Sequence, residues 1–307
     1  MHEPQSTEET APRPEPPFPP TTSLKAAMGA FERYMRQQDF AENTIKSFLN
    51  DLKILTQFTG VSRAVGNIGT RDLEEFLEWM QTKRGVPCSP KSLARRITTL
   101  KVFFGWLTEA GVLLTDPAAP IIHHPVSTPL PTVLSDEEIE RLLQTTQALR
   151  QGDPPDARPH LLVTLLLHTG IKKGECVQIE LNHLDLSNPA QPFLWIRYKD
   201  PRHHHKERKL SLPDGWAEVL AEYREQYKPQ DRLFPWTARN LEYVLRDVAH
   251  RADLPRGLSF AMLRWTCALR DYKAGMPEEK LRRKLGLSPV SWREVKVKLT
   301  RLAERPL

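Results

Sequence analysis

Apolar residues recur at helical spacing through the first third of the chain. Side chains three and four positions apart share one face of a helix, so the pattern predicts four helices between residues 22 and about 110. Thr70 is expected to cap the third helix, and Ser89 followed by Pro90 marks the start of the fourth. The apolar positions are Leu24, Met28, Phe31 and Met35; Ile45, Phe48, Leu52, Leu55 and Phe58; Leu73, Phe76, Leu77 and Met80; and Leu93, Ile97, Leu100, Phe104 and Leu107. The sequence therefore predicts a four-helix domain over residues 22–115.

The second half of the chain combines helical patterns with two short strand-like patterns. Ser135, with Glu138 three residues later, forms a capping box that marks a helix start. The expected elements are helices from residue 135, over 161–167, 258–273, 277–285 and 290–302, and strands near 193–198 and 209–212 with a polar hairpin loop between them. The prediction is a mainly α fold, with a small β-sheet in a second domain over residues 133–307.

Proline-rich segments precede and separate these two domains. Pro117, Pro120, Pro125, Pro129 and Pro131 punctuate residues 116–132, which are predicted to form an interdomain linker. Residues 1–21 are acidic and proline-rich and are expected to be disordered, because they offer little apolar surface to bury. They lack the basic start and apolar core of a signal peptide, and no apolar run approaches the ~20 residues that span a membrane. A cytoplasmic protein is expected.

Charge adds a candidate partner to this picture. The formal net charge is +6, and residues 1–21 hold one arginine against four glutamates, so the rest of the chain carries +9. That balance favours a polyanionic partner. Lys91, Arg95, Arg96 and Lys101 have no acid on their own predicted helix, so phosphate contact is slightly favoured over a solvated face. Cys88, Cys176 and Cys267 are expected to be free thiols, and no metal or cofactor is expected.

Both halves of the chain resemble the tyrosine recombinases of the phage-integrase family. The segment AENTIKSFLNDLKILTQFTG is similar to a helix of that family's core-binding domain. The segment SPKSLARRITTLKVFFGWLTEAGVLLTDPAAPI is similar to the closing helix and the exit to the linker. The resemblance implies a SAM-like core-binding domain, then a catalytic-type α+β domain, with duplex DNA as the partner.

The resemblance also implies a particular chemistry. In the family a tyrosine attacks a DNA phosphate, two arginines hold its non-bridging oxygens, and a strand lysine protonates the leaving oxygen. Lys172 stands where the turn "TG-x-R-x-x-E" has the first arginine, whereas Glu175 keeps the acid. Lysine lacks the planar fork of arginine. The strand lysine matches Lys199, with Lys206 as a second candidate.

The remaining family positions have mostly changed chemical type. The motif "H-x-x-R" is represented by Ala261 and Arg264, and Leu287 replaces the histidine of "LGH". The nucleophile position falls on Lys296, and no tyrosine follows Tyr272. The resemblance therefore implies an inactive member of the family.

Three hypotheses follow from these residues. The first is a DNA-binding protein, associated with the nucleoid, that clamps duplex DNA without cleaving it and regulates, bridges or protects a site. The second is an enzyme in which Lys296 attacks phosphate, although an unperturbed lysine, with a pKa of about 10.4, is protonated at neutral pH. The third is a protein-interaction module that no longer binds DNA. The expected DNA contacts are Lys91, Arg95, Arg96, Lys101, Lys172, Lys199, Lys206, Arg208, Arg264 and Lys296.

A homo-oligomer on DNA is a further expectation. The tail after about Val290 would be its contact element, and the alternative is that this helix folds back on its own domain. No small-molecule substrate is expected.

Overall fold

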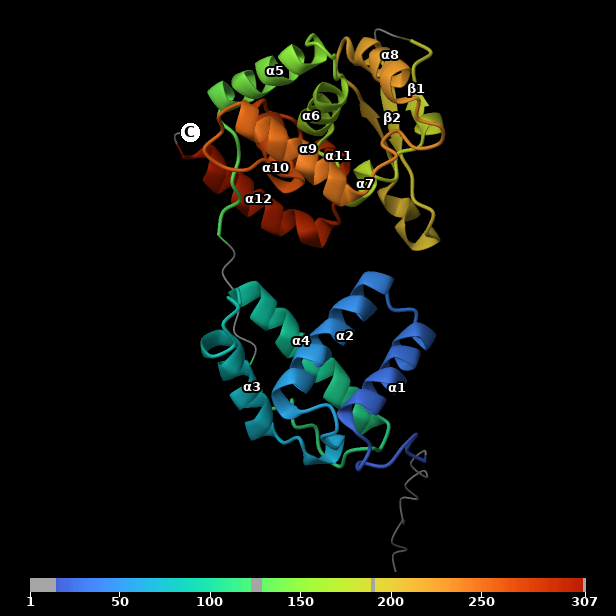
Figure 1. Ribbon diagram of the computed structural model, residues 1–307, viewed down its shortest axis with the longest axis vertical. Coiled ribbons are helices and arrows are strands. Elements are labelled where there is room, and N and C mark those ends of the chain that lie inside the picture. The colour runs from blue at the N-terminus through green and yellow to red at the C-terminus, as the bar shows by residue number, and fades with distance from the viewer. Residues whose placement is uncertain (1–14, 123–128, 189–190, 306–307) are drawn as a thin grey trace, which may run out of the picture. The chain divides into compact units, whose positions relative to one another are not determined.

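The structure is a computed structural model that describes residues 15–122, 129–188 and 191–305. Its contacts divide the chain into two compact units, Met1–Thr128 and Pro129–Leu307, each of which is described by itself (Figure 1). The first unit contains the helices α1 (Leu24–Gln37), α2 (Glu42–Thr59), α3 (Thr70–Thr82) and α4 (Pro90–Glu109), with a 3-10 turn, η1 (Val65–Asn67). The predicted four-helix domain is confirmed.

The core of the first unit is built from the apolar faces of its four helices. The ring of Phe31 on α1 lies 5.1 Å from that of Phe103 and 5.2 Å from that of Trp106, both on α4. Ser89 caps α4, because its hydroxyl accepts from the amide of Ser92. The cap predicted at Thr70 is wrong. Gly69 is the N-cap of α3, and the Thr70 hydroxyl donates instead to Pro117 O at 2.8 Å.

The first unit extends further than the sequence predicted at both ends. Residues 15–21 are not disordered: the Phe18 ring lies 6.1 Å from that of Trp106, and the Gly66 amide donates to Pro20 O at 2.9 Å. At the other end, Ala118 and Ile121 are buried in the same core. Composition showed the prolines of these segments, but not that the apolar residues between them reach the core. Residues 1–14 and 123–128 lie outside the described residues.

The second unit is mainly helical around a small sheet. Its helices are α5 (Asp136–Arg150), α6 (Arg158–Thr169), α7 (Lys173–Cys176), α8 (Trp216–Tyr227), α9 (Ala238–Arg251), α10 (Phe260–Lys273), α11 (Glu278–Lys284) and α12 (Pro289–Ala303), with 3-10 turns η2 (Leu181–His183) and η3 (Pro201–Lys206). The strands β1 (Leu184–Asp185), β2 (Phe193–Ile196) and β3 (Arg208–Ser211) form an antiparallel sheet in the order β1-β2-β3. The predicted fold class is therefore confirmed, although η3 replaces the expected hairpin loop.

The start of the second unit agrees with the sequence at the first helix but not at the linker before it. The capping box at Ser135 is present, since Ser135 and Glu138 each bond the other's amide. The expected linker also ends early, because Leu130 and Val133 pack against the apolar cluster of α10, α11 and α12. No helix within the described residues is long and apolar enough to cross a membrane.

Helix α6 is the centre of the second unit and sets the position of the site. Its leucines are buried, and it packs against α5, α8, α9 and α10 (Figure 1). Gly170 follows its last residue, Thr169, and has a φ of 60°, a backbone conformation that favours glycine. A Cβ at Gly170 would lie 3.1 Å from both Cys267 Sγ on α10 and Leu285 Cδ2. Glycine therefore brings the turn after α6 close to α10 and to the turn after α11.

Candidate functional site

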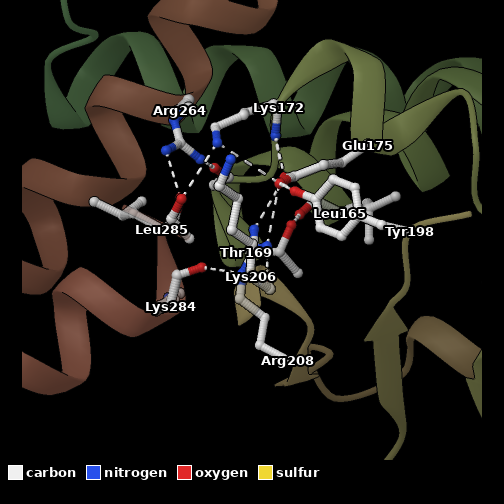
Figure 2. Close-up of polar contacts among 12 residues, drawn as sticks. Leu165, Thr169, Lys172, Glu175, Tyr198, Lys206, Arg208, Arg264, Lys284 and Leu285 are labelled. Carbon is white, nitrogen blue, oxygen red and sulfur yellow. Dashed lines mark hydrogen bonds and ion pairs between the residues drawn. The ribbon is translucent and has the colours of Figure 1, made fainter. Parts of the chain in front are cut away.

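Four segments of the second unit meet at one cluster of polar side chains (Figure 2). The turn after α6, with the short helix α7 that follows it, supplies Lys172 and Glu175; the end of η3 supplies Lys206, β3 supplies Arg208, and α10 supplies Arg264. The backbone turn between α11 and α12 closes the cluster. Of the residues predicted for the site, the structure therefore brings together Lys172, Lys206, Arg208 and Arg264.

Glu175 is the anionic centre of the cluster. Its Oε1 and Oε2 lie 3.1 and 2.9 Å from Nη1 and Nη2 of Arg208, and its carboxylate also accepts from the Tyr198 hydroxyl and the Lys172 amide. Burial raises the pKa of Glu175, but the hydrogen bonds and charge of Arg208 outweigh that effect and lower the pKa to about 2. The side chain of Arg208 is only 8% exposed. The cation predicted as a DNA contact at Arg208 is thus a buried ion-pair partner.

Four successive backbone carbonyl oxygens at the end of α11 and in the turn after it accept hydrogen bonds from positively charged side chains. Lys284 O accepts from Arg208 Nε at 2.7 Å, and Leu285 O accepts from Arg264 Nη2 at 2.6 Å. The carbonyls that follow, of Gly286 and Leu287, accept from Lys172 Nζ at 3.3 Å and from Arg282 Nη1 at 2.7 Å. Gly286 has a φ of 58°, and a Cβ there would lie 2.7 Å from Arg208 Nη1. Apart from the glycine of the Leu-Gly-Leu motif, nothing in the sequence indicated the role of this turn.

Lys172 is a cation of the cluster that keeps partial access to solvent. Its side chain is 41% exposed. Burial lowers the pKa of Lys172, and the nearby charges of Arg264, Arg208 and Lys206 lower it further, whereas Glu175 raises it. A lysine surrounded by more positive than negative charge is stabilised by any anion that approaches it.

Arg264 uses both terminal nitrogens on the protein backbone. Nη1 donates to Gly170 O, and Nη2 donates to Leu285 O. Arg264 is partly buried, and this burial lowers the pKa of its guanidinium. The position of this arginine is therefore fixed by two turns.

The two strand-lysine candidates are separated by the structure. Lys206 belongs to the cluster of Figure 2, and its charge acts on Lys172. Lys199 is 82% exposed, and its Nζ lies 3.4 Å from Glu180 Oε1. Both residues line a cavity of about 350 Å³.

The other residues that the resemblance assigns to family positions lie on α10, on α12 and in the turn between α11 and α12. Lys296 lies on α12, with Nζ 2.6 Å from Glu278 Oε1, and this hydrogen bond raises the pKa of Lys296. Ala261 is exposed in the first turn of α10, and Leu287 packs against the cluster around α12.

In the first unit the predicted basic helix face is only partly a free surface. Asp51 on α2 is 4% exposed, and it pairs with Arg95 and, at 3.5 Å, with Arg96. Arg96 is 11% exposed, and its Nη1 lies 2.9 Å from Cys88 Sγ. Arg96 is therefore a buried ion-pair partner and not an exposed cation. Residue spacing along α4 could not predict this pair, because Asp51 lies on another helix, α2. Lys91 is exposed, and Lys101 Nζ lies 3.4 Å from Ala119 O.

Two protein-family models match the chain. "Phage integrase, N-terminal SAM-like domain" matches residues 28–112, and "Phage integrase family" matches residues 132–292, which is more than half of the chain. The chain belongs to the phage integrase family. The two matched regions fall in the two units of this integrase-family chain.

Relatives of this integrase-family chain are named as recombinases. It is 25% identical over 166 residues to the tyrosine recombinase XerC of Mycobacterium sp. (strain KMS), covering 53% of this chain and 55% of that relative. The chain thus spans about half the length of this relative. It is 23% identical over 280 residues to the tyrosine recombinase XerD of Listeria innocua, covering 87% and 91% of the two chains.

Solved structures share the fold of the integrase-family chain. The Tn1549 transposon integrase, in complex with transposon right end DNA, has a TM-score of 0.71 at 17% identity and covers 93% of this chain and 96% of its own. The XerH site-specific recombinase bound to difH substrate has a TM-score of 0.67 at 21% identity, with coverage of 95% and 98%. The two-domain tyrosine recombinase fold is therefore confirmed.

Proposed function

We propose that this member of the phage integrase family binds duplex DNA and holds it without cutting or joining strands. The observation that carries the proposal is the side chain at the nucleophile position, where Lys296 is engaged in an ion pair with Glu278. The match to the family's second domain ends at residue 292, before this position. The chain would then regulate, bridge or protect a DNA site, in the cytoplasm with the chromosome.

Other nucleophiles near the site are also held in unreactive states. Burial, together with the charge of Glu175, raises the pKa of Tyr198 to about 12, so its hydroxyl remains protonated near neutral pH. The hydroxyls of Ser288 and Ser291 lie 3.1 Å from each other at the start of α12. Neither Ala261 nor Leu287 offers a base that could activate them. A raised lysine pKa likewise keeps Lys296 protonated.

Duplex DNA is the partner that the charge of the site supports. A depression of about 460 Å³ beside the cluster is lined by cations that include Lys206, Arg282 and Arg283. In the first unit, Lys91 and Arg95 are exposed on α4 and Lys101 is half-buried there, although Arg95 also pairs with Asp51. Lysine contacts with phosphates give affinity without sequence information. Two of the solved structures with this fold are described as complexes, one with difH substrate and one with transposon right end DNA, and this supports the same partner here.

The proposal is tested with a nicked DNA site that traps a covalent protein–DNA intermediate. We expect no adduct on a denaturing gel, because four positions of the family's chemistry have changed and losing one preorganised donor costs ~10²–10³ in rate. The variants Lys296→Tyr, Lys296→Ala and Tyr198→Phe are run in parallel, and the first should also stay inactive. An adduct lost in Lys296→Ala or in Tyr198→Phe would refute the proposal and identify the attacking residue. If the protein binds no duplex at low salt, DNA binding itself is refuted and an interaction module is favoured.

A further inference from the structure

Arg264 connects the ends of two helices that are distant in the sequence. It donates to Gly170 O, the first carbonyl after α6, and to Leu285 O, the first after α11. Carbonyls at the C-terminal end of a helix have no partner within the helix, and a cation there opposes the negative end of the helix dipole. One guanidinium therefore caps both helices.

The two turns also pack directly against each other. The glycine at 170 is close enough to Leu285 that a Cβ would lie 3.1 Å from Cδ2. If Arg264 turned away toward a DNA phosphate, both carbonyls would lose its hydrogen bonds at this close contact, and each buried carbonyl left without a partner is costly.

We propose that Arg264 is a positioning residue that fixes these two turns, and that, of the two positions that hold the family's arginines, it is the one occupied by Lys172 that contacts phosphate. The inference rests on the proposed DNA binding and deepens it, because it reassigns the role of the one family arginine that the chain retains. Arg264 holds the backbone of the turn from Gly170 to Glu175, and this turn carries Lys172.

Lys172 is held less tightly than Arg264, although its Nζ also lies 3.9 Å from Glu175 Oε1. Its side chain is 41% exposed, and its hydrogen bond to Gly286 O is the longest of the four bonds to the turn, at 3.3 Å. A charged donor gains more from a phosphate oxygen than from a neutral carbonyl. Lys172 can therefore exchange its single carbonyl for phosphate, whereas Arg264 would have to give up two.

The test compares melting temperature with the salt dependence of DNA binding in the full chain. The variants are Arg264→Gln, Arg264→Lys and Lys172→Gln, with Arg141→Gln as a control that removes one exposed positive charge on α5. Melting is measured without DNA, and affinity is measured by fluorescence anisotropy on a labelled duplex of random sequence over a series of salt concentrations. The slope of log affinity against log salt counts phosphate contacts, at about 0.9 per contact.

The proposal expects two separate effects. Both Arg264 variants should lower the melting temperature by roughly 5–10 °C and leave the slope unchanged, since lysine reaches one carbonyl only. Lys172→Gln should melt within about 2 °C of the unmodified protein but lower the slope by about 0.9. The control should change neither quantity.

The opposite pattern would overturn the proposal. If Arg264 contacts phosphate, Arg264→Gln lowers the slope by about 0.9 with unchanged melting, and Arg264→Lys restores the slope. Should Arg264→Gln fail to fold, Arg264→Lys decides, because full stability with lysine would contradict the double cap. If the unmodified protein does not bind the duplex, the proposed function and the role of Lys172 fail, while the melting comparison still decides the role of Arg264.

Discussion

At the residue scale, the structure separates cations that look alike in the sequence. Arg96 and Arg208 were both predicted as phosphate contacts, yet each is buried against an acid from another element, Asp51 or Glu175. Sequence spacing reveals partners on the same helix, whereas these acids reach their arginines only through tertiary folding. The resemblance assigned residues of this chain to family positions. It could not say whether the charge at each of these positions faces solvent.

The Glu175–Arg208 ion pair predicts how stability responds to acid. A carboxyl whose pKa is lowered by folding, here from 4.5 to about 2, stabilises the fold above pH 4.5 and loses that contribution as the pH falls toward 2. The loss amounts to roughly 3 kcal/mol in the free energy of unfolding.

Urea unfolding between pH 2 and pH 6 measures this contribution. The unmodified protein should lose stability steeply over that window, and Glu175→Gln should be less stable at pH 6 with a weaker dependence on pH. Glu140→Gln, which changes an exposed acid on α5, is the control. Equal pH dependence in Glu175→Gln and in the unmodified protein would contradict the assignment.

At the scale of elements, α12 packs against its own unit on one face and leaves two apolar side chains exposed on another. Trp292, Leu299 and Leu302 are buried in its own unit, so one face of the helix does fold back. Val290 and Val297 lie seven residues apart on another face and are 74% and 52% exposed. Apolar periodicity predicted this helix well, but it could not say which apolar positions remain outside.

The outward valines are expected to support self-association on DNA. Val297→Asp places a charge at the exposed position, so it should weaken cooperative binding without lowering the melting temperature by more than about 2 °C. The measurement is the ratio of singly to multiply bound duplex in a gel shift, with Val61→Asp as the control, because Val61 is an exposed valine of the first unit. Unchanged cooperativity in Val297→Asp would leave α12 with its structural role alone.

At the scale of the whole molecule, both units are expected to contribute phosphate contacts. Affinity for duplex DNA should fall steeply between about 50 and 200 mM salt, because each neutralised phosphate releases counterions. Lys91→Gln in the first unit and Lys206→Gln in the second should each lower the slope by about 0.9. Anisotropy titrations of the full-length variants measure both. A slope that responds to only one of them would restrict DNA binding to that unit.

The division into two units was predictable from the sequence, whereas its boundaries were not. Helical periodicity and the resemblance together indicated a four-helix domain followed by a mainly helical one. The predicted boundaries differ from the structure where apolar residues of the proline-rich segments, such as Phe18 and Ile121, pack into the core of the first unit. Composition alone does not reveal such tertiary contacts.

The distribution of thiols gives each unit its own chemical reporter. The three cysteines are free; Cys88 is partly accessible in the first unit, whereas Cys176 and Cys267 are buried in the second. Cys267 is buried with its Sγ beside Gly170, so opening of the turn at the end of α6 would expose this thiol to a reagent. The labelling rate at Cys267 therefore measures how often the site opens, and DNA that stabilises the closed turn would slow it.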